Sequence, residues 1–437
     1  MNKERLVILG AAGKDFHVFN MVYRTNADVE VVAFTATQIP DIAGRKYPPE
    51  LSGELYPQGI PILDEKDLAS IIKEKNIETV VHAYSDTRHD EVMNLASIAN
   101  ANGADFKLLA MDKTMLTTDK PVISINAVRT GVGKSQTSRY VTNILKEAGY
   151  KVVAMRHPMP YGDLTKQIAQ RFAEYSDLDK YECTIEEREE YEPYIDRGFV
   201  IFSGVDYEKI LRMAEKEADV IIWDGGNNDT PFVKPNLHIC LADPHRAGHE
   251  MLYHPGETNF LSANVIVINK VDSAKKEDID SIIANAKKYN PTAQIIQTAS
   301  PVTIEDEEKV KGKKVLVIED GPTITHGSMA FGAGIIAAQQ INATVVDPKP
   351  YLVGSIKAAF EKYSQLDMAL PALGYSEKQL NELEQVIDAC ECDCVLSATP
   401  IDITRVIKVN KPLVRVRYDS KEIDGTKLKD MVLAAVK

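Results

Sequence analysis

The sequence predicts an α/β fold with several mostly parallel sheets. Short apolar runs rich in Val and Ile alternate with amphipathic segments of helical length from end to end. Strands that are buried on both faces of a parallel sheet have this character. The chain has 437 residues, and since a domain holds roughly 100 to 200 residues, about three domains are expected. Its 44% hydrophobic and 26% charged residues are typical of an ordinary folded protein.

The expected elements fall into three series along the chain. The segment 108–120 closes the first series, and Pro121 opens a strand that begins the second. An acidic run and a lysine-rich stretch over residues 305–314 then precede a new strand. We therefore predict three α/β domains, over residues 1–118, 119–314 and 315–437. The strand-like runs are, in order, residues 6–9, 29–34, 79–83, 122–125, 152–155, 220–223, 265–268 and 315–318.

Charge and composition exclude several classes of protein. The chain has 51 Lys and Arg against 64 Asp and Glu, a formal net charge of −13, which disfavours binding to nucleic acid or to an anionic membrane. No uninterrupted apolar run is long enough to span a membrane, and the first residues do not form a secretory signal. The 5 cysteines are too few for a disulfide scaffold. We therefore expect a cytoplasmic protein.

A phosphate-binding loop is the strongest motif. Residues 123–137 read as a buried strand, the turn Gly131-Val132-Gly133 and then a helix that begins Lys134-Ser135-Gln136. Glycines let backbone N–H groups surround phosphate oxygens, and the helix N-terminus adds its dipole. In such a loop the lysine reaches the β and γ phosphates and the following hydroxyl ligates Mg²⁺. The motif predicts a central P-loop NTPase domain.

The loop departs from the common pattern at its start. Val128 stands where G-x-x-x-x-G-K-[ST] has its first glycine. The stretch from Arg129 to Ser135 instead resembles the variant loop of the signal-recognition and metallochaperone class of P-loop proteins. That class carries a cation five positions before the invariant lysine, and the resemblance assigns this position to Arg129.

A carboxylate follows another buried strand. Asp224 comes directly after residues 220–223 and is followed by Gly225 and Gly226. Asp224 is suited to hold Mg²⁺ through water, and Gly226 or Asn227 to sense the γ phosphate. Taken alone, an acidic residue that ends a strand before a turn would be an ordinary structural feature.

The base of the nucleotide has its own candidate motif. Asn269-Lys270-Val271-Asp272 follows the strand 265–268 and has the N-K-x-D arrangement of GTPases. There the carboxylate accepts hydrogen bonds from guanine N1–H and its exocyclic amine, while Asn269 and the Lys270 stem support the base. Residues 298–300 could add a backbone contact. Both ATP and GTP remain open as substrates.

The outer two domains carry weaker signals. An apolar strand runs into the turn Gly10-Ala-Ala-Gly13, the shape of a Rossmann-like N-terminal domain. Residues 319–327 follow another strand and place hydroxyl and N–H groups at a helix start. A phosphate or the substrate could dock there, and a purely structural turn explains the pattern equally well.

Five further segments carry a resemblance to a known family: residues 10–17, 83–86, 156–163, 184–193 and 223–229. They resemble segments of a prokaryotic family described as predicted GTPases, which is related to, and often named as, cyclic 2,3-diphosphoglycerate synthetase. The likeness covers nearly the whole chain. It implies an enzyme that uses a nucleoside triphosphate to close an intramolecular phosphoanhydride in 2,3-diphosphoglycerate and releases the nucleoside diphosphate and phosphate.

This chemistry accumulates negative charge and therefore depends on positioning and on cations. We expect Lys134, Arg129 and Mg²⁺ to act at the nucleotide. At the substrate we expect Arg156 and His157, which follow the strand 152–155, and Arg188, which the resemblance singles out. The expected partner is a small phosphorylated metabolite, and a homodimer is compatible with the sequence.

A regulatory or metallochaperone-type GTPase that works through conformational change is the alternative. The N-K-x-D motif at residues 269–272 supports it. The absence of a His-rich tract and of a C-x-x-C pair weakens metal delivery. A cyclising ligase and a GTPase switch thus remain the two hypotheses.

Overall fold

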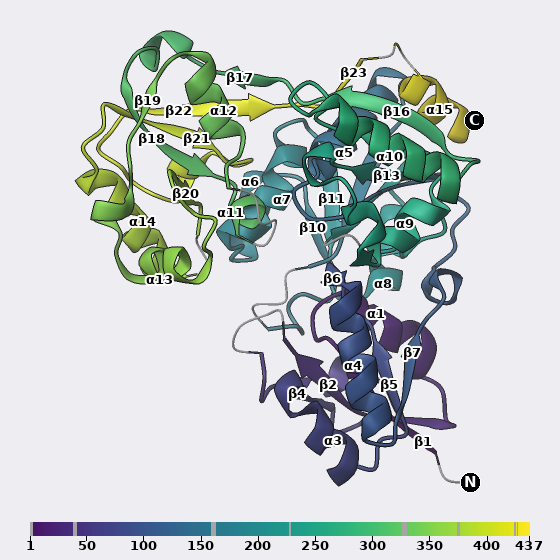
Figure 1. The fold of residues 1–437 in the computed structure, drawn as a ribbon. Coiled ribbons are helices and arrows are strands. Elements are labelled where there is room, and N and C mark those ends of the chain that lie inside the picture. Colours follow the sequence, from purple (N-terminus) through teal and green to yellow (C-terminus); the bar gives the residue numbers. More distant parts are fainter. Residues whose placement is uncertain are drawn as a thin grey trace.

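A computed structural model of the chain describes residues 3–37, 42–158, 163–226, 229–325, 330–373, 376–423, 425 and 427–437. Three large sheets follow one another along the chain, and helices flank each of them (Figure 1). Most strand pairs within the sheets are parallel. The predicted α/β class with several mostly parallel sheets is therefore confirmed.

The N-terminal sheet has the order β3-β4-β2-β1-β5-β7. Only β3 at its edge runs antiparallel to its neighbour. Apolar side chains cover both faces of this sheet, so its strands are nearly continuous apolar runs. Its strands are β1 (Glu4–Leu9), β2 (Val29–Ala36), β3 (Lys46–Tyr47), β4 (Ile60–Asp64), β5 (Thr79–His82) and β7 (Asp105–Leu108). Its helices are α1 (Lys14–Val18), α2 (Pro49–Ser52), α3 (Leu68–Glu74) and α4 (His89–Ala101).

The central sheet has the order β10-β11-β9-β12-β8-β13-β15-β16-β23. Every residue of β8 is buried, as a strand in the middle of a covered sheet must be. The strands are β8 (Val122–Ala127), β9 (Val152–Arg156), β10 (Gln170–Phe172), β11 (Val200–Ser203), β12 (Val220–Asp224), β13 (Leu237–Ala242), β15 (Val265–Ile268), β16 (Gln294–Ala299) and β23 (Lys421–Glu422). The helices are α5 (Lys134–Glu147), α6 (Tyr175–Lys180), α7 (Ile185–Ile195), α8 (Tyr207–Ala214), α9 (Gly256–Ser262) and α10 (Lys276–Tyr289).

The position of β8 explains where the motifs meet. It lies between β12 and β13, and all three strands run parallel. Loops that follow the carboxyl ends of such strands gather at one edge of the sheet, where open α/β folds bind ligands. The phosphate loop, Asp224 and the motif after β15 all lie at this edge.

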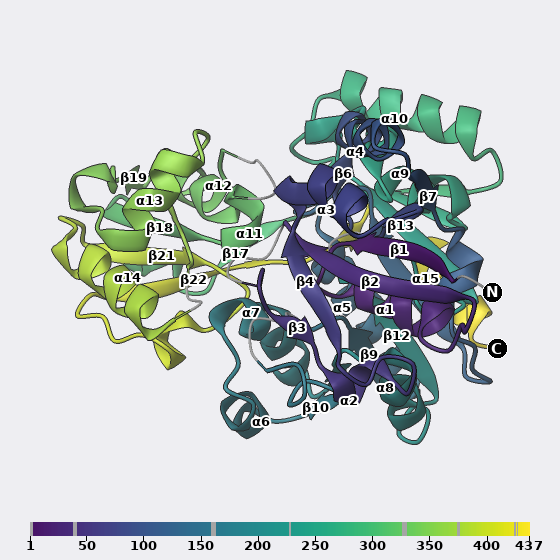
Figure 2. The same cartoon turned by 90° about the horizontal axis from the view of Figure 1, so that it is seen from below.

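The C-terminal sheet has the order β17-β22-β21-β18-β19, and β20 also pairs with β18. It lies beside the central sheet in Figure 2, while the N-terminal sheet lies in front. Its strands are β17 (Val302–Ile304), β18 (Lys314–Glu319), β19 (Thr344–Val345), β20 (Ala369–Pro371), β21 (Cys394–Ala398) and β22 (Leu413–Tyr418). Its helices are α11 (Gly321–Ile324), α12 (Ala333–Gln340), α13 (Gly354–Lys362) and α14 (Glu377–Ala389).

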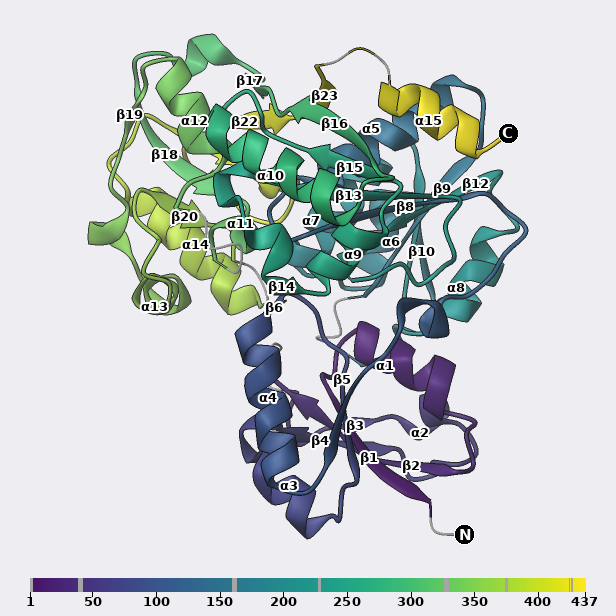
Figure 3. The ribbon, with the colours of Figure 1, turned by 45° about the vertical axis from the view of Figure 1, so that its right-hand side comes forward.

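Two connections link the sheets. The short strands β6 (Thr87–Arg88) and β14 (Tyr253–His254) pair and join the N-terminal part to the central part. At the other end of the chain, β23 pairs with β16, and α15 (Lys427–Ala435) lies beside α5 (Figure 3). The predicted division into three domains remains a prediction. The last segment, which holds β23 and α15, falls in the predicted third domain but packs against the central part. Among the described residues, no helix has both the length and the apolar character needed to cross a bilayer.

The contact of α15 with the central sheet predicts a stability effect. Leu428 is fully buried in the same apolar core as residues of β8. Leu428→Ala should lower the free energy of unfolding by about 2–5 kcal/mol, because it leaves a cavity there. Urea unfolding followed by circular dichroism measures this change. Lys427→Ala, at an exposed neighbouring position, is the control. Equal stability of the two variants would show that α15 detaches in solution.

Candidate active site

The phosphate loop has the backbone that its glycines predict. Gly131 and Gly133 have φ angles of 79° and 104°, which residues with side chains rarely adopt. A Cβ atom on Gly133 would also lie 2.1 Å from Nδ2 of Asn269. Helix α5 begins directly after Gly133, at Lys134. The N–H groups of its first turn have no partner within the helix and are suited to bind an anion.

Asp224 lies under this loop and is fully buried. Lys134 Nζ lies 2.5 Å from Oδ1 of Asp224, and the Ser138 hydroxyl donates to the same oxygen at 3.0 Å. Arg156 and Tyr194 donate to Oδ2, each at 3.0 Å. Burial alone would raise the pKa of Asp224, but Lys134 and Arg156 outweigh burial and hold it well below its ordinary value. Asp224 is therefore an ionised carboxylate with four donors.

The same network lowers the pKa of Lys134 and holds Arg156 in ion pairs. Burial and the neighbouring Arg156 lower the pKa of Lys134, while Asp224 opposes this change. Arg156 is buried and also forms an ion pair with Glu190 of α7. Arg156 is thus bound between two carboxylates and is not a separate cation presented to a substrate.

Asn269 and Lys270 hold the phosphate loop through hydrogen bonds to its backbone carbonyl groups. The Asn269 amide donates to the Val132 carbonyl at 2.9 Å. The Lys270 ammonium donates to the Gly131 carbonyl at 2.7 Å and lies 2.8 Å from Oδ2 of Asp243. Both side chains therefore fix the loop backbone, which is a role independent of the base.

Asp272 stands at the rim of the site. Its Oδ1 accepts the backbone N–H of Ser300 at 3.1 Å, and the Ser300 hydroxyl donates to Gln136 at 2.8 Å. Thr298 donates to Asn269 at 2.8 Å. Residues 298–300 thus hold the motif in place. Reading of guanine by Asp272 remains a prediction.

The glycines after Asp224 lie in tight surroundings. A Cβ atom on Gly225 would lie 2.8 Å from Nδ2 of Asn126, and one on Gly226 would lie 1.3 Å from Cε1 of His157. Any side chain at Gly226 would therefore displace His157. Asn227, the other candidate for sensing the γ phosphate, lies outside the described residues.

The structure does not assemble all the predicted cations at one point. The Arg129 guanidinium donates to Asp86 at 2.8 Å and lies 3.8 Å from the ring centroid of Tyr253. It lines the cleft beside the loop, but Asp86 of the N-terminal part partners its charge. Arg129 therefore links two parts of the chain instead of standing alone at the nucleotide.

His157 and Arg188 take other positions. His157 is buried, with Nδ1 3.8 Å from Oδ2 of Asp229. Burial and the nearby Arg156 lower its pKa to about 3, so it is neutral at pH 7 and adds no positive charge. Arg188 pairs with Asp179 at 2.5 Å and Glu192 at 3.4 Å, and it is not among the described residues that line the cleft. The basic cluster that we expected at the substrate is therefore not formed by these two residues.

A cleft between the central and C-terminal sheets contains the phosphate loop. Cations and carboxylates both line it, the carboxylates coming from α7 and from the end of β18. The charged lining residues are Arg129, Lys134, Arg139, Arg156, Lys270, Glu189, Glu190, Glu319 and Asp320. Of the segment 319–327, which we singled out for docking, residues 326 and 327 lie outside the described residues.

Glu319 has a structural role in this wall. It accepts the backbone N–H groups of Gly332 and Ile335, each at 3.0 Å, and of Gly334 at 3.2 Å. Burial raises the pKa of Glu319 to about 7, although the N–H groups favour its ionised form. Glu319 thus caps the N-terminus of α12 and lines the cleft.

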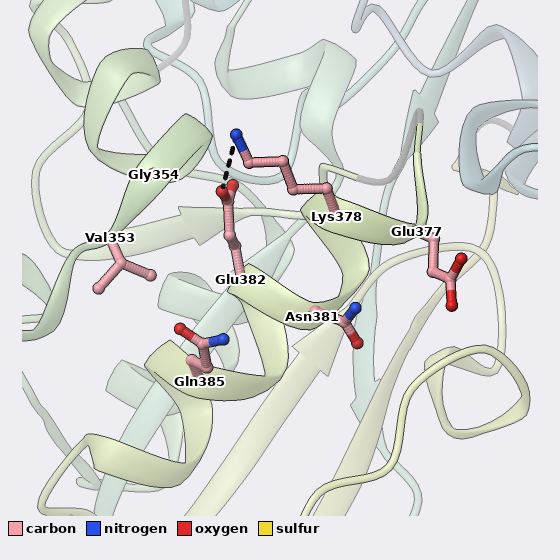
Figure 4. Close-up of a pocket in the computed structure, with 7 residues that line it drawn as sticks. All are labelled: Val353, Gly354, Glu377, Lys378, Asn381, Glu382 and Gln385. Atoms are coloured by element: carbon pink, nitrogen blue, oxygen red, sulfur yellow. Dashed lines mark ion pairs between the residues drawn. The ribbon is translucent and has the colours of Figure 1, made fainter.

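A second hollow lies apart from this cleft, in the C-terminal part. The side chains that line it come from the start of α13 and from α14 (Figure 4). Glu382 accepts the backbone N–H of Ser355 at 2.8 Å and pairs with Lys378 at 3.8 Å. None of the residues predicted from the sequence is among its described lining. We assign it no ligand.

Sequence reasoning missed several partners in the site. Asp243 directly follows the buried strand β13, so its position carried the same signal as that of Asp224. Tyr194 and Ser138 lie inside helices, and no spacing rule points them at a strand end 30 or 86 residues away. Glu189 belongs to a run of acidic residues on a helix, a pattern that usually marks a solvated face. Only the three-dimensional packing places it in the cleft.

The fold and the site together define a P-loop-like α/β protein. Arginine synthetase ArcE of Thermococcus kodakarensis is 60% identical over 431 residues, which cover 98% of this chain and 96% of that protein. The chain belongs to this synthetase family. Cyclic 2,3-diphosphoglycerate synthetase of Thermococcus sibiricus is 28% identical over 243 residues, or 50% of this chain and 54% of that protein.

These relatives support part of the expected resemblance. Both are named synthetases, so the chain is a nucleoside-triphosphate-dependent ligase or synthetase, as predicted. Neither is named a GTPase, and the GTPase description gains no support from them. No family model matches the chain.

Solved structures resemble the chain only loosely. LpxK from Aquifex aeolicus, crystallised with ATP, has a TM-score of 0.45 at 13% identity and covers 80% of this chain and 97% of that one. The MinC:MinD complex of Aquifex aeolicus has a TM-score of 0.24 at 15% identity, over 41% of this chain and 81% of that one.

The Lys134 contacts predict the effect of its removal. Lys134→Ala should lower nucleotide-dependent turnover by at least about 100-fold, because a preorganised cation at the transferred phosphate is lost. Turnover is measured as the phosphate or the nucleoside diphosphate that is released. Lys146→Ala, at the exposed far end of the same helix, should keep normal turnover. Unchanged turnover in a folded Lys134→Ala protein would place the phosphate site elsewhere.

Proposed function

We propose that the protein is a nucleotide-dependent arginine synthetase. The supporting observation is the 60% identity to a protein of that name over 98% of this chain. The phosphate loop keeps Gly133, Lys134 and Ser135, and the ionised Asp224 lies beside Lys134. The protein thus has the groups needed to bind and use a nucleoside triphosphate.

The network around Asp224 gives Lys134 two alternative partners. When a triphosphate binds at the N-terminus of α5, its β and γ oxygens compete with Asp224 for the ammonium group of Lys134. Asp224 then keeps Arg156, Ser138 and Tyr194 as donors, so it stays ionised without Lys134. Lys134 can therefore move to the phosphates without leaving an unpaired buried charge.

Mg²⁺ fits this site in a limited way. The Ser135 hydroxyl lines the cleft and is available as a ligand. Both Asp224 oxygens already accept hydrogen bonds, so Asp224 would reach the ion through water. When bound, Mg²⁺ would neutralise phosphate charge and orient the γ phosphoryl group.

A synthetase of this kind must make a leaving group. Transfer of the γ phosphoryl group to an oxygen of the second substrate converts that oxygen into a phosphate ester. Attack by a nitrogen nucleophile then forms the carbon–nitrogen bond and releases phosphate. Both steps build negative charge beside Lys134, where a preorganised cation stabilises it.

The cleft favours arginine chemistry over closure of a phosphoanhydride in 2,3-diphosphoglycerate. A substrate with several negative charges needs unpaired cations around it. Here Arg156 is paired with Glu190 and Arg129 with Asp86, while Glu189 and Asp320 also line the cleft. The diphosphoglycerate relative also shares only 50% of this chain.

The proposal is tested by the reverse reaction, because its nitrogen donor is then not needed. The protein is incubated with L-arginine, ADP or GDP, phosphate and Mg²⁺, and the triphosphate formed is measured. We expect triphosphate that depends on arginine and is absent with Lys134→Ala. In parallel, phosphorus NMR follows 2,3-diphosphoglycerate with ATP or GTP. If a cyclic anhydride forms and no arginine-dependent triphosphate is detected, the arginine synthetase proposal is wrong. Cyclic 2,3-diphosphoglycerate synthesis would then be the better proposal.

The base is tested at Asp272. If Asp272 reads guanine, turnover should favour GTP over ATP, and Asp272→Asn should shift preference towards xanthosine triphosphate, whose base has the complementary edge. The measurement is kcat/KM for the three nucleotides. Clear ATP preference with no effect of Asp272→Asn would leave Asn269 and Lys270 as supports of the loop alone.

A further inference from the structure

The junction between the N-terminal and central parts gathers four of the five segments that carry the family resemblance. Helix α1 lies at this junction, beside α8 of the central part (Figure 1). The Ser85 hydroxyl donates to Oδ1 of Asp229, and Oδ2 of Asp229 lies 3.8 Å from Nδ1 of His157. A Cβ atom on Gly13 would lie 3.4 Å from Cβ of His157. The segments whose described residues meet here are 10–17, 83–86, 156–163 and 223–229.

The topology of the N-terminal sheet favours a ligand site at this junction. Strand β1 pairs with β2 on one side and with β5 on the other. The chain first adds β2, β3 and β4 on one side and then crosses back to add β5 and β7. Open α/β sheets bind ligands at the carboxyl ends of the strands where the strand order reverses in this way. Here the loop after β1 leads to Lys14, and the loop after β5 holds Ser85.

Lys14 is a cation of this crevice that the chain does not pair. Among the described residues, its side chain forms neither a hydrogen bond nor an ion pair, and it is only partly buried. Burial lowers the pKa of Lys14, while the charges of Asp229 and Asp15 oppose this change from beyond contact distance. Arg129 and Arg156, in contrast, each contact a carboxylate. Lys14 is therefore open to an anionic ligand.

Two buried hydrogen-bonding groups beside Gly13 also lack partners among the described residues. They are the hydroxyl group of Tyr207 and Nδ1 of His157. A Cβ atom on Gly13 would lie 3.3 Å from the Tyr207 hydroxyl, so this group faces the residue that precedes Lys14. Buried polar groups are normally hydrogen-bonded, and a donor without a partner costs free energy. A polar ligand at the junction would supply the missing bonds.

We propose that this junction is the subsite for the carboxylate of the second substrate, with Lys14 as its cation and the Tyr207 hydroxyl as a donor. This inference rests on the proposed function, because the product of that reaction, L-arginine, carries an α-carboxylate. A carboxylate accepts several hydrogen bonds and makes its strongest ones with cationic donors. One carboxylate can therefore satisfy both side chains.

Asp229 connects this subsite with the phosphate loop. The Asn126 amide, from the strand that leads into the loop, donates to the Asp229 carbonyl. Burial raises the pKa of Asp229 to about 6, while Lys14 and Lys134 both oppose this change. Asp229 is thus within electrostatic reach of both lysines. A substrate whose carboxylate contacts Lys14 can extend its other end towards Lys134, where the phosphoryl group is transferred.

The test compares L-arginine with agmatine, which is arginine without its carboxylate. Calorimetric titration with each ligand, with Mg²⁺ and ADP present, measures the affinities of the wild type and of Lys14→Met. We expect Lys14→Met to weaken L-arginine roughly 10- to 100-fold, as loss of a charge-assisted contact does, and to change agmatine affinity less than about twofold. ADP affinity should be unchanged, because Lys14 is not among the described residues that line the phosphate-loop cleft.

Lys73→Met is the matched control, because Lys73 is an exposed residue of α3 in the same part of the chain. It should leave all three affinities unchanged. Tyr207→Phe is a second variant, and it removes only a hydroxyl group that has no partner among the described residues. It should melt at the wild-type temperature and weaken L-arginine about tenfold, as loss of a hydrogen bond to a charged group does. If Lys14→Met does not fold, the same comparison is made with Tyr207→Phe.

The outcomes distinguish the subsite from the proposed function. Equal L-arginine affinity in the wild type and Lys14→Met overturns the subsite, even if arginine-dependent triphosphate is formed. Equal weakening of L-arginine and agmatine overturns it as well, because Lys14 then does not act on the carboxylate. If L-arginine does not bind to the wild type, 2,3-diphosphoglycerate, which also carries a carboxylate, is titrated in its place. Binding that Lys14→Met weakens then supports the subsite while the arginine proposal fails, and a wild type that binds neither ligand overturns the subsite.

Discussion

The buried charge of Asp224 is the interaction on which the site depends. Moving a carboxylate out of water costs several kcal/mol unless cations and hydrogen-bond donors compensate it. Its donors come from α5 (Lys134 and Ser138), the end of β9 (Arg156) and α7 (Tyr194). One ionised group therefore fixes the relative positions of three elements, and it holds Lys134 ready beside the phosphate loop.

Much of this arrangement is readable from the sequence, because parallel strands impose it. Lys134 and Asn269 come after buried strands and Asp224 ends one, and parallel strands of that kind end at a common edge. The α/β class and the phosphate loop follow from the same rule. The loop glycines are equally readable, since Gly133 adopts a φ angle that other residues avoid.

Side-chain partners across long sequence separations are not readable in this way. Arg129 has the spacing of a nucleotide-binding cation, yet Asp86, 43 residues away, partners it in the structure. His157 looks basic in the sequence, and only its burial beside Arg156 shows that it is neutral. Arg188 is different, because its partner Glu192 lies one helical turn away and could have been anticipated.

The same rule of paired charges applies inside the cleft. The cations Arg129 and Arg156 have carboxylate partners from this chain, Asp86 and Glu190. These two cations are therefore already compensated when a substrate arrives. In a chain of net charge −13, a polyanionic second substrate would have to compete with Asp86 and Glu190 for them, which disfavours such a substrate.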